Sequence, residues 1–125
     1  MGILNGVFGS KSEKKETPGI NWIQLTSEDQ LETLSKTSVL FKHSTRCGIS
    51  SSVIKRFEKQ HADLNDKVDF YYLDLLNFRD ISGVIAEKFQ VIHQSPQVVV
   101  VKNNKLVAHG SHYDILELDL KAFLE

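Results

Sequence analysis

A single cysteine, Cys47, lies within the polar stretch His43–Ser52, which reads HSTRCGISSS. A cysteine thiolate is a nucleophile and a metal ligand, so this stretch could carry thiol chemistry. The alternative is that Cys47 is a small buried hydrophobe, as many lone cysteines are. The residues on both sides of Cys47 are mostly polar or small, which is typical of a boundary with solvent. We therefore interpret Cys47 as a reactive thiol.

The residues that flank Cys47 predict the elements that would position it. The apolar run Val39–Phe41 predicts a strand over Ser38–His43. Next, Ile49, Val53, Ile54 and Phe57 recur at steps of three and four, which predicts a helix from about Cys47 to Asp63 with this stripe facing the core. Cys47 then lies at a helix N-terminus, where unpaired backbone N–H groups and a partial positive charge stabilise a thiolate.

Several neighbours of Cys47 could help it to react with a partner. Arg46 and His43 add positive potential beside the thiol, and we expect both to contribute to substrate binding. Gly48 places no side chain next to the sulfur, which eases the approach of a partner. Ser50 offers a hydroxyl group to the first helical turn or to the thiolate.

The rest of the chain predicts alternating strands and helices. Strands are expected at 20–25, 38–43, 67–76, 97–101 and 105–110. Helices are expected at 27–36, at 47–63, from a cap at Asn77 or Asp80 to Phe89, and at 114–124. Ser27 and Gln30 form a capping box for the first helix, and Asn103 and Asn104 form the turn of a final hairpin. We therefore predict an α/β fold, a mixed central sheet of four to five strands with helices on both faces.

The position of Pro96 favours a thioredoxin-like fold. Pro96 comes just before the strand expected at 97–101. In thioredoxin-like folds, a cis-proline precedes this strand and faces the active cysteine, while the backbone of its neighbour, here Ser95, pairs with the incoming chain. A trans proline that ends a loop is the alternative, because few X–Pro bonds in folded proteins are cis.

Composition limits the classes of function. The net charge is −1 and 41% of the residues are hydrophobic, so no basic field favours nucleic acid or an anionic membrane. No apolar stretch approaches the ~20 residues of a membrane span. One cysteine forms no internal disulfide, and the N-terminus does not resemble a signal peptide, so we expect a cytoplasmic protein. We also expect a monomer, with a flexible tail at 1–19 and one domain at 20–125.

Two blocks of sequence resemble the monothiol bacilliredoxins, a thioredoxin-like family of the bacillithiol system. The blocks read FKHSTRCGIS and SPQVVVVKNNKLVAHGSH, and the resemblance covers about Trp22–Leu124. It implies that Cys47 is the active cysteine and Pro96 the cis-proline. Gly48 departs from the family pattern, in which proline usually follows the cysteine. Residues that match family blocks around the site, and so are expected in substrate binding, are His43, Ser44, Thr45, Ser50, Ser95, His109 and His112.

The resemblance implies an enzyme that reverses mixed disulfides between bacillithiol, or a similar small thiol, and the cysteines of client proteins. The small thiol is a co-substrate, and no cofactor is expected. Because the chain has no second cysteine, the thiol that regenerates Cys47 must come from outside.

Two other functions remain open. CGIS resembles the CGFS of monothiol glutaredoxins, which hold an iron–sulfur cluster between two subunits, but AHGSHYD (108–114) lacks the glycine pair of that family. A non-catalytic thioredoxin-like binding module is the third possibility.

The other histidines and Asp74 carry weaker functional signals than Cys47. His109 and His112 form a weak metal motif without nearby carboxylate or thiolate partners, so we expect no metal. The loop that holds them is instead expected to shape a pocket for the small thiol, or else His112 is a capping or surface residue. We expect His61 and His93 at the surface. Asp74 is interpreted as an exposed residue at a strand end, with a buried proton-handling carboxylate as the alternative.

Overall fold

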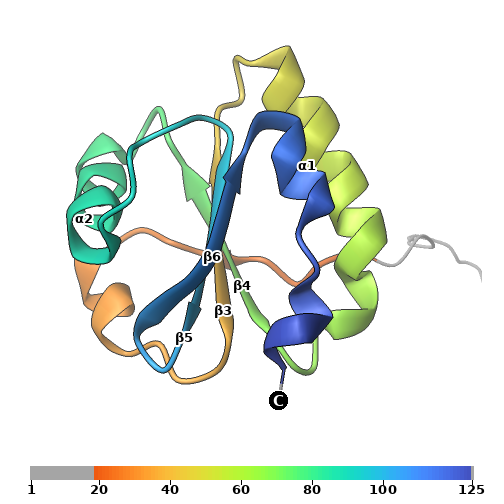
Figure 1. Ribbon diagram of the computed structural model, residues 1–125. Coiled ribbons are helices and arrows are strands. Elements are labelled where there is room, and N and C mark those ends of the chain that lie inside the picture. The colour runs from red at the N-terminus through yellow and green to blue at the C-terminus, as the bar shows by residue number, and fades with distance from the viewer. Residues whose placement is uncertain (1–18, 125) are drawn as a thin grey trace, which may run out of the picture.

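The computed structural model describes residues 19–124, which form a five-stranded mixed sheet between two layers of helices (Figure 1). The predicted tail at 1–19 lies outside the described residues except for Gly19. The strand order is β2-β4-β3-β5-β6. The strands are β2 (Ile23–Gln24), β3 (Ser38–His43), β4 (Asp69–Asp74), β5 (Gln97–Lys102) and β6 (Lys105–Ser111).

Strand β3 is at the centre of the sheet, and all six of its residues are buried. It pairs in parallel with β4, so that Leu40 faces Tyr71, and antiparallel with β5, so that Leu40 also faces Val99. β2 adds to the outer side of β4 in parallel, and β6 adds to β5 as a hairpin. Apolar residues on both faces suit a strand that is covered on both sides.

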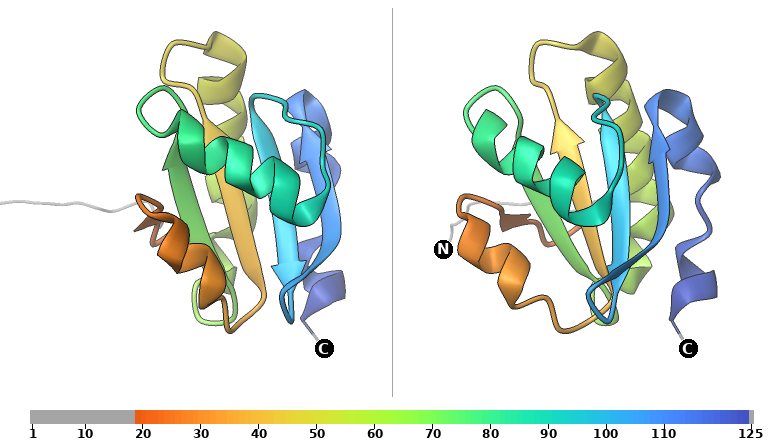
Figure 2. Two further views of the ribbon diagram at one scale, coloured as in Figure 1. Left: turned by 90° about the vertical axis from the view of Figure 1, so that its left-hand side faces the viewer. Right: turned by 60° about the vertical axis from the view of Figure 1, so that its left-hand side comes forward.

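Two helices cover opposite faces of the sheet (Figure 2). Helix α1 (Gly48–His61) and the C-terminal segments cover one face, and helix α2 (Arg79–Phe89) with the 3₁₀ helix η1 (Glu28–Glu32) covers the other. Each face has its own apolar core. The core under α1 includes Phe41, Val53, Phe57, Phe70 and Val98, and the core under α2 includes Leu40, Leu73, Ile81, Ile85 and Val99.

Three predicted helices differ in the structure. The first is only the 3₁₀ helix η1, although the Gln30 side chain does accept a hydrogen bond from the Ser27 backbone N–H (3.1 Å) as the capping box predicts. The helix expected at 47–63 ends as α1 at His61, and the short 3₁₀ helix η2 (Ala62–Leu64) follows it. The last is two 3₁₀ helices, η3 (His112–Glu117) and η4 (Leu120–Phe123).

The break between the last two 3₁₀ helices has a packing reason. Leu118 has an extended backbone (φ −73°, ψ 129°). The break lets Ile115 and Leu120, which are five positions apart, both reach the core under α1. Residues five apart do not share a face of a continuous α-helix.

The hairpin between β5 and β6 agrees with its sequence signal. Asn103 and Asn104 both have positive φ values, 54° and 63°, which is the geometry of a two-residue turn of the predicted kind.

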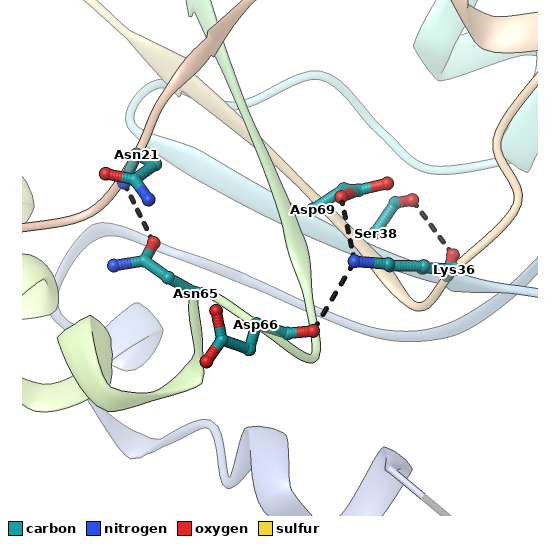
Figure 3. Close-up of polar contacts among 6 residues, drawn as sticks. All are labelled: Asn21, Lys36, Ser38, Asn65, Asp66 and Asp69. Atoms are coloured by element: carbon teal, nitrogen blue, oxygen red, sulfur yellow. Dashed lines mark hydrogen bonds and ion pairs between the residues drawn. The ribbon is translucent and has the colours of Figure 1, made fainter.

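Polar contacts tie together the chain segments at the starts of β3 and β4 (Figure 3). Lys36 Nζ donates to the Asp66 carbonyl (3.4 Å) and lies 3.8 Å from Asp69 Oδ1. Asn65 Oδ1 accepts the backbone N–H of Asn21 at 2.8 Å. This end of the sheet is therefore closed by structural contacts, and the chemistry-bearing residues gather at the other end.

No helix within residues 19–124 combines the length and the apolar character needed to cross a membrane.

Candidate active site

Cys47 lies at the junction of β3 and α1, as the N-cap residue of the helix. Its backbone is extended (φ −108°, ψ 120°), and Gly48 is the first helical residue. The backbone N–H of Cys47 donates to the Ser44 carbonyl (3.2 Å), and the Cys47 carbonyl accepts the N–H of Ser51 (3.1 Å). The side chain is half-buried and makes no capping hydrogen bond. The sulfur therefore lies at the positive end of a 14-residue helix, as the flanking pattern predicts.

The surface beside Cys47 is formed by the predicted residues Thr45, Arg46 and Gly48, which are all exposed. Ile49 is also exposed, with 41% of its surface accessible, although the sequence pattern counts it among the apolar residues that face the core. A partner that approaches Cys47 thus meets one positive charge, small polar groups and one apolar side chain.

Ser50 and His43 form a buried pair beneath this surface. Ser50 Oγ lies 2.7 Å from His43 Nδ1 and accepts the backbone N–H of Ser44 at 3.1 Å. Ser44 is also buried. These three predicted residues are thus placed where they support the turn before Cys47.

The surroundings of His43 favour the neutral form of its ring. Burial lowers the pKa of His43, and the negative charges of Asp74 and Glu58 oppose this effect in part. Asp74 faces His43 in the parallel register of β3 and β4. One Asp74 oxygen accepts the Asn77 side-chain N–H (2.8 Å), and the other is buried without a hydrogen-bond partner among residues 19–124. Asp74 is half-buried, between the two interpretations made from the sequence.

The segment before β5 has the predicted proline geometry. The Ser95–Pro96 peptide bond is cis. Lys42 pairs with Gln97 across β3 and β5, so Pro96 lies at the same edge of the sheet as Cys47. Ser95 is half-buried, and its Oγ has no hydrogen-bond partner within the described chain.

His109 and His112 flank the proline segment in different ways. His109, on β6, lines a cavity of about 360 Å³ with Gln97, Ser111 and residues of the 90–94 loop. His112 has a positive φ of 55°, and its backbone N–H donates to the Pro96 carbonyl at 3.0 Å. In the described part of the chain, no group of three or more His, Cys, Asp or Glu side chains is arranged to hold a metal ion.

Lys42 also lies in this region, although no local sequence pattern marks it as a functional residue. Lys42 is fully buried, although it directly precedes His43 at the end of β3. Its Nζ donates to His93 Nδ1 (3.2 Å) and to the Ser82 carbonyl (3.4 Å). Burial lowers the pKa of Lys42 from 10.5 to about 8. Lys42 is buried because α2 and the loop before Pro96 cover this face of the sheet, and a local sequence pattern does not predict such packing.

Comparison with known families decides the assignment. The family model of the monothiol bacilliredoxin BrxC matches residues 23–120. The chain belongs to the monothiol bacilliredoxin family. Its match covers both sequence blocks that carry the resemblance, and it spans every strand of the sheet.

Solved structures agree on the fold of this bacilliredoxin. A protein described as having a thioredoxin fold is 36% identical, with a TM-score of 0.68, and the alignment covers 75% of this chain and 85% of that one. Thioredoxin of Malassezia sympodialis is 25% identical (TM-score 0.63; 90% and 94% covered). Thioredoxin of Trypanosoma brucei brucei is 18% identical (TM-score 0.64; 89% and 96% covered). The thioredoxin-like fold is thus confirmed, and family and fold together support a thiol redox function.

Gly48, where bacilliredoxins usually have proline, has room for a larger residue. A Cβ atom added at Gly48 meets nothing within 4 Å. Gly48 is the first residue of α1, a position that favours proline because its N–H has no partner inside the helix. The backbone of Cys47 already lies in the region preferred before proline.

Gly48→Pro is therefore expected to stabilise the fold by about 1 kcal/mol, because proline restricts the unfolded chain. Urea unfolding of the variant and the natural protein measures this difference. Gly48→Ala is the matched control, with an expected gain of roughly half that size. A lower free energy of unfolding for Gly48→Pro would contradict the geometry described for this turn.

Proposed function

We propose that this bacilliredoxin reduces mixed disulfides between a low-molecular-weight thiol, with bacillithiol the first candidate, and the cysteines of client proteins. The observation that carries the proposal is the position of Cys47, the half-buried N-cap of α1 at the sheet edge that also holds Pro96. A thiolate is stabilised at such a helix end and can attack a disulfide sulfur.

In the first step, the Cys47 thiolate attacks the sulfur of the small thiol in the mixed disulfide. A new S–S bond forms between Cys47 and the small thiol, and the S–S bond to the client breaks. The client leaves as a thiolate and takes up a proton from solvent. Thr45, Arg46 and Gly48, exposed beside Cys47, are the residues proposed to meet the incoming substrate.

In the second step, a thiol from outside the chain regenerates the enzyme. The residue three positions after Cys47 is Ser50, whose buried hydroxyl is engaged with His43 and the Ser44 backbone. An external thiolate attacks the small-thiol sulfur on Cys47, releases the Cys47 thiolate and leaves as a disulfide with the small thiol. The reducing equivalents therefore come from this external thiol.

The proposal is tested with one client protein that carries either bacillithiol or glutathione on a single cysteine. Without added thiol, release of the client is expected to stop at one equivalent per enzyme molecule, and the enzyme mass increases by one small thiol. Added free bacillithiol is expected to restore turnover, with faster release from the bacillithiol-modified client. Continued turnover without any added thiol would overturn the one-cysteine cycle.

A further inference from the structure

A buried positive charge lies on the α2 side of the sheet, next to the active-site edge. Lys42 is fully buried on β3, between Leu73 of β4 and Gln97 of β5 in the sheet register. Within residues 19–124, no carboxylate forms an ion pair with it. A buried charge without a counter-charge is costly, so a protein that keeps one is expected to use it.

The ammonium group of Lys42 also has spare hydrogen-bonding capacity. It carries three N–H donors, and the structure gives it two acceptors, His93 Nδ1 at 3.2 Å and the Ser82 carbonyl at 3.4 Å. Both contacts are long for a charged donor. The pKa of His93 is lowered first by burial and then by the positive charge of Lys42. Neither neighbour neutralises the charge.

The two residues that hold Lys42 also line a cavity. Ser82 and His93 form part of the wall of a space of about 320 Å³, together with Leu75, Arg79 and Gly83. Arg79 is exposed, and it is the first residue of α2. No acidic side chain is among the described residues that line the space. The helix end, Arg79 and Lys42 behind the wall thus combine into a positive potential at this space. The nearest acidic residues in the sequence, Asp74 before Leu75 and Asp80 after Arg79, are not part of its lining.

The residues that line the cavity come from the same end of the sheet as Cys47. Leu75 follows β4, and its backbone N–H donates to the His43 carbonyl at 3.0 Å. His93 comes three residues before Pro96 in the loop that leads into β5. The cavity therefore lies between the turn after β4 and the proline loop, where the carboxyl ends of two parallel strands meet. This is the usual location of ligand sites in open α/β sheets.

We propose that this cavity binds a carboxylate group of the low-molecular-weight thiol that is joined to the client protein. The inference rests on the proposed function and identifies the carboxylate as the group of the small thiol that the site recognises. Arg79 presents a planar fork that matches a carboxylate at the cavity wall, and Lys42 supplies the buried counter-charge behind Ser82 and His93. A single carboxylate matches the one buried charge.

Binding to the cavity is tested first without any redox chemistry. The full chain is titrated with malonate, a small dicarboxylate, while the backbone amide of Gly83 and the ring of His93 are followed by NMR. We expect both signals to shift with saturation, and at least tenfold weaker binding in Lys42→Met and in Arg79→Gln. Lys105→Met, which removes an exposed cation of β6, is the matched control with unchanged binding.

Two results of this titration would overturn the inference. Malonate could bind Lys42→Met and Arg79→Gln as tightly as it binds the natural protein, or its shifts could appear only outside the cavity. Inorganic phosphate serves as a second probe, and binding of phosphate without binding of malonate would also reject a carboxylate site. Arg79 is exposed, so its variant keeps the test valid if Lys42→Met does not fold.

The link to the reaction needs a pair of substrates that differ only in charge. A client modified with glutathione is compared with the same client modified with glutathione dimethyl ester, which lacks the negative charges. We expect kcat/KM to be at least tenfold higher for the acid, mainly through KM, and this preference to disappear in Lys42→Met. Equal kcat/KM values for acid and ester in the natural protein would overturn the carboxylate inference. Failure of the proposed function would give a different result, because no small-thiol adduct would then form on Cys47 with any client.

Discussion

Cys47→Ser is expected to abolish both the small-thiol adduct and the release of client above the uncatalysed background. Cys47 is the only cysteine of the chain, so no other residue can form a disulfide. A serine hydroxyl does not take part in thiol–disulfide exchange, because the attacking group must be a thiolate. Intact-protein mass after incubation with a disulfide of the small thiol, and the rate of client release, measure the two effects.

The Cys47→Ser variant is expected to lose this activity while it remains folded. The loss would therefore report on the missing thiol and not on unfolding. Cys47 is the half-buried N-cap of α1, and serine is among the preferred N-cap residues. The free energy of unfolding should therefore stay within about 1 kcal/mol of the natural value. Ser51→Ala, on the next turn of α1, is the control with unchanged release. A small-thiol adduct on the Cys47→Ser protein would show that the nucleophile is assigned wrongly.

The sequence predicts those parts of the site that local patterns determine. The strand at Ser38–His43 has the same bounds in the structure, because the apolar run is bounded by polar residues on both sides. The spacing of Val53 and Phe57 places α1 correctly, and with it Cys47 at the helix start. The cis bond before Pro96 follows from the fold family and not from the local residues, since an X–Pro bond is usually trans.

Burial of polar residues could not be predicted in the same way, because it depends on elements that are distant in the sequence. His61 is expected at the surface, and this prediction is wrong. His61 is only 8% exposed, and its ring lies 4.6 Å from that of Phe57, centroid to centroid. The C-terminal 3₁₀ segments, which pack beside α1, replace the continuous helix that the spacing at 114–124 predicts.

His43 and Ser50 show the same limit within the active site. Their types and positions suggest contact with a substrate, but the structure pairs them inside the protein at 2.7 Å. His43 is at the end of β3 and Ser50, seven residues later, is in the first turn of α1. The local sequence pattern does not predict that these two side chains contact each other. Thr45, Arg46 and Gly48 are the predicted residues of this turn that the structure leaves exposed.

Lys42→Met is expected to change how stability depends on pH above neutrality. Burial lowers the pKa of Lys42 to about 8 in the folded protein, whereas the unfolded chain keeps the ordinary value of 10.5. Between these values the unfolded state binds more protons than the folded state, so this residue makes the natural protein more stable as the pH rises. Over the whole window the gain is about 3 kcal/mol, and it is absent from the methionine variant.

The measurement compares urea unfolding of both proteins at pH 7, 8.5 and 10. Because burial raises the pKa of Tyr71 and Tyr72, these groups also titrate near the upper limit, but they are shared and cancel in the difference. We expect Lys42→Met to gain stability relative to the natural protein at pH 7 and to lose this advantage towards pH 10. Lys105→Met, at an exposed position, should follow the natural curve. Parallel curves for Lys42→Met and the natural protein would mean that the Lys42 ammonium is not held at a cost, and would remove the reason to expect an anion beside it.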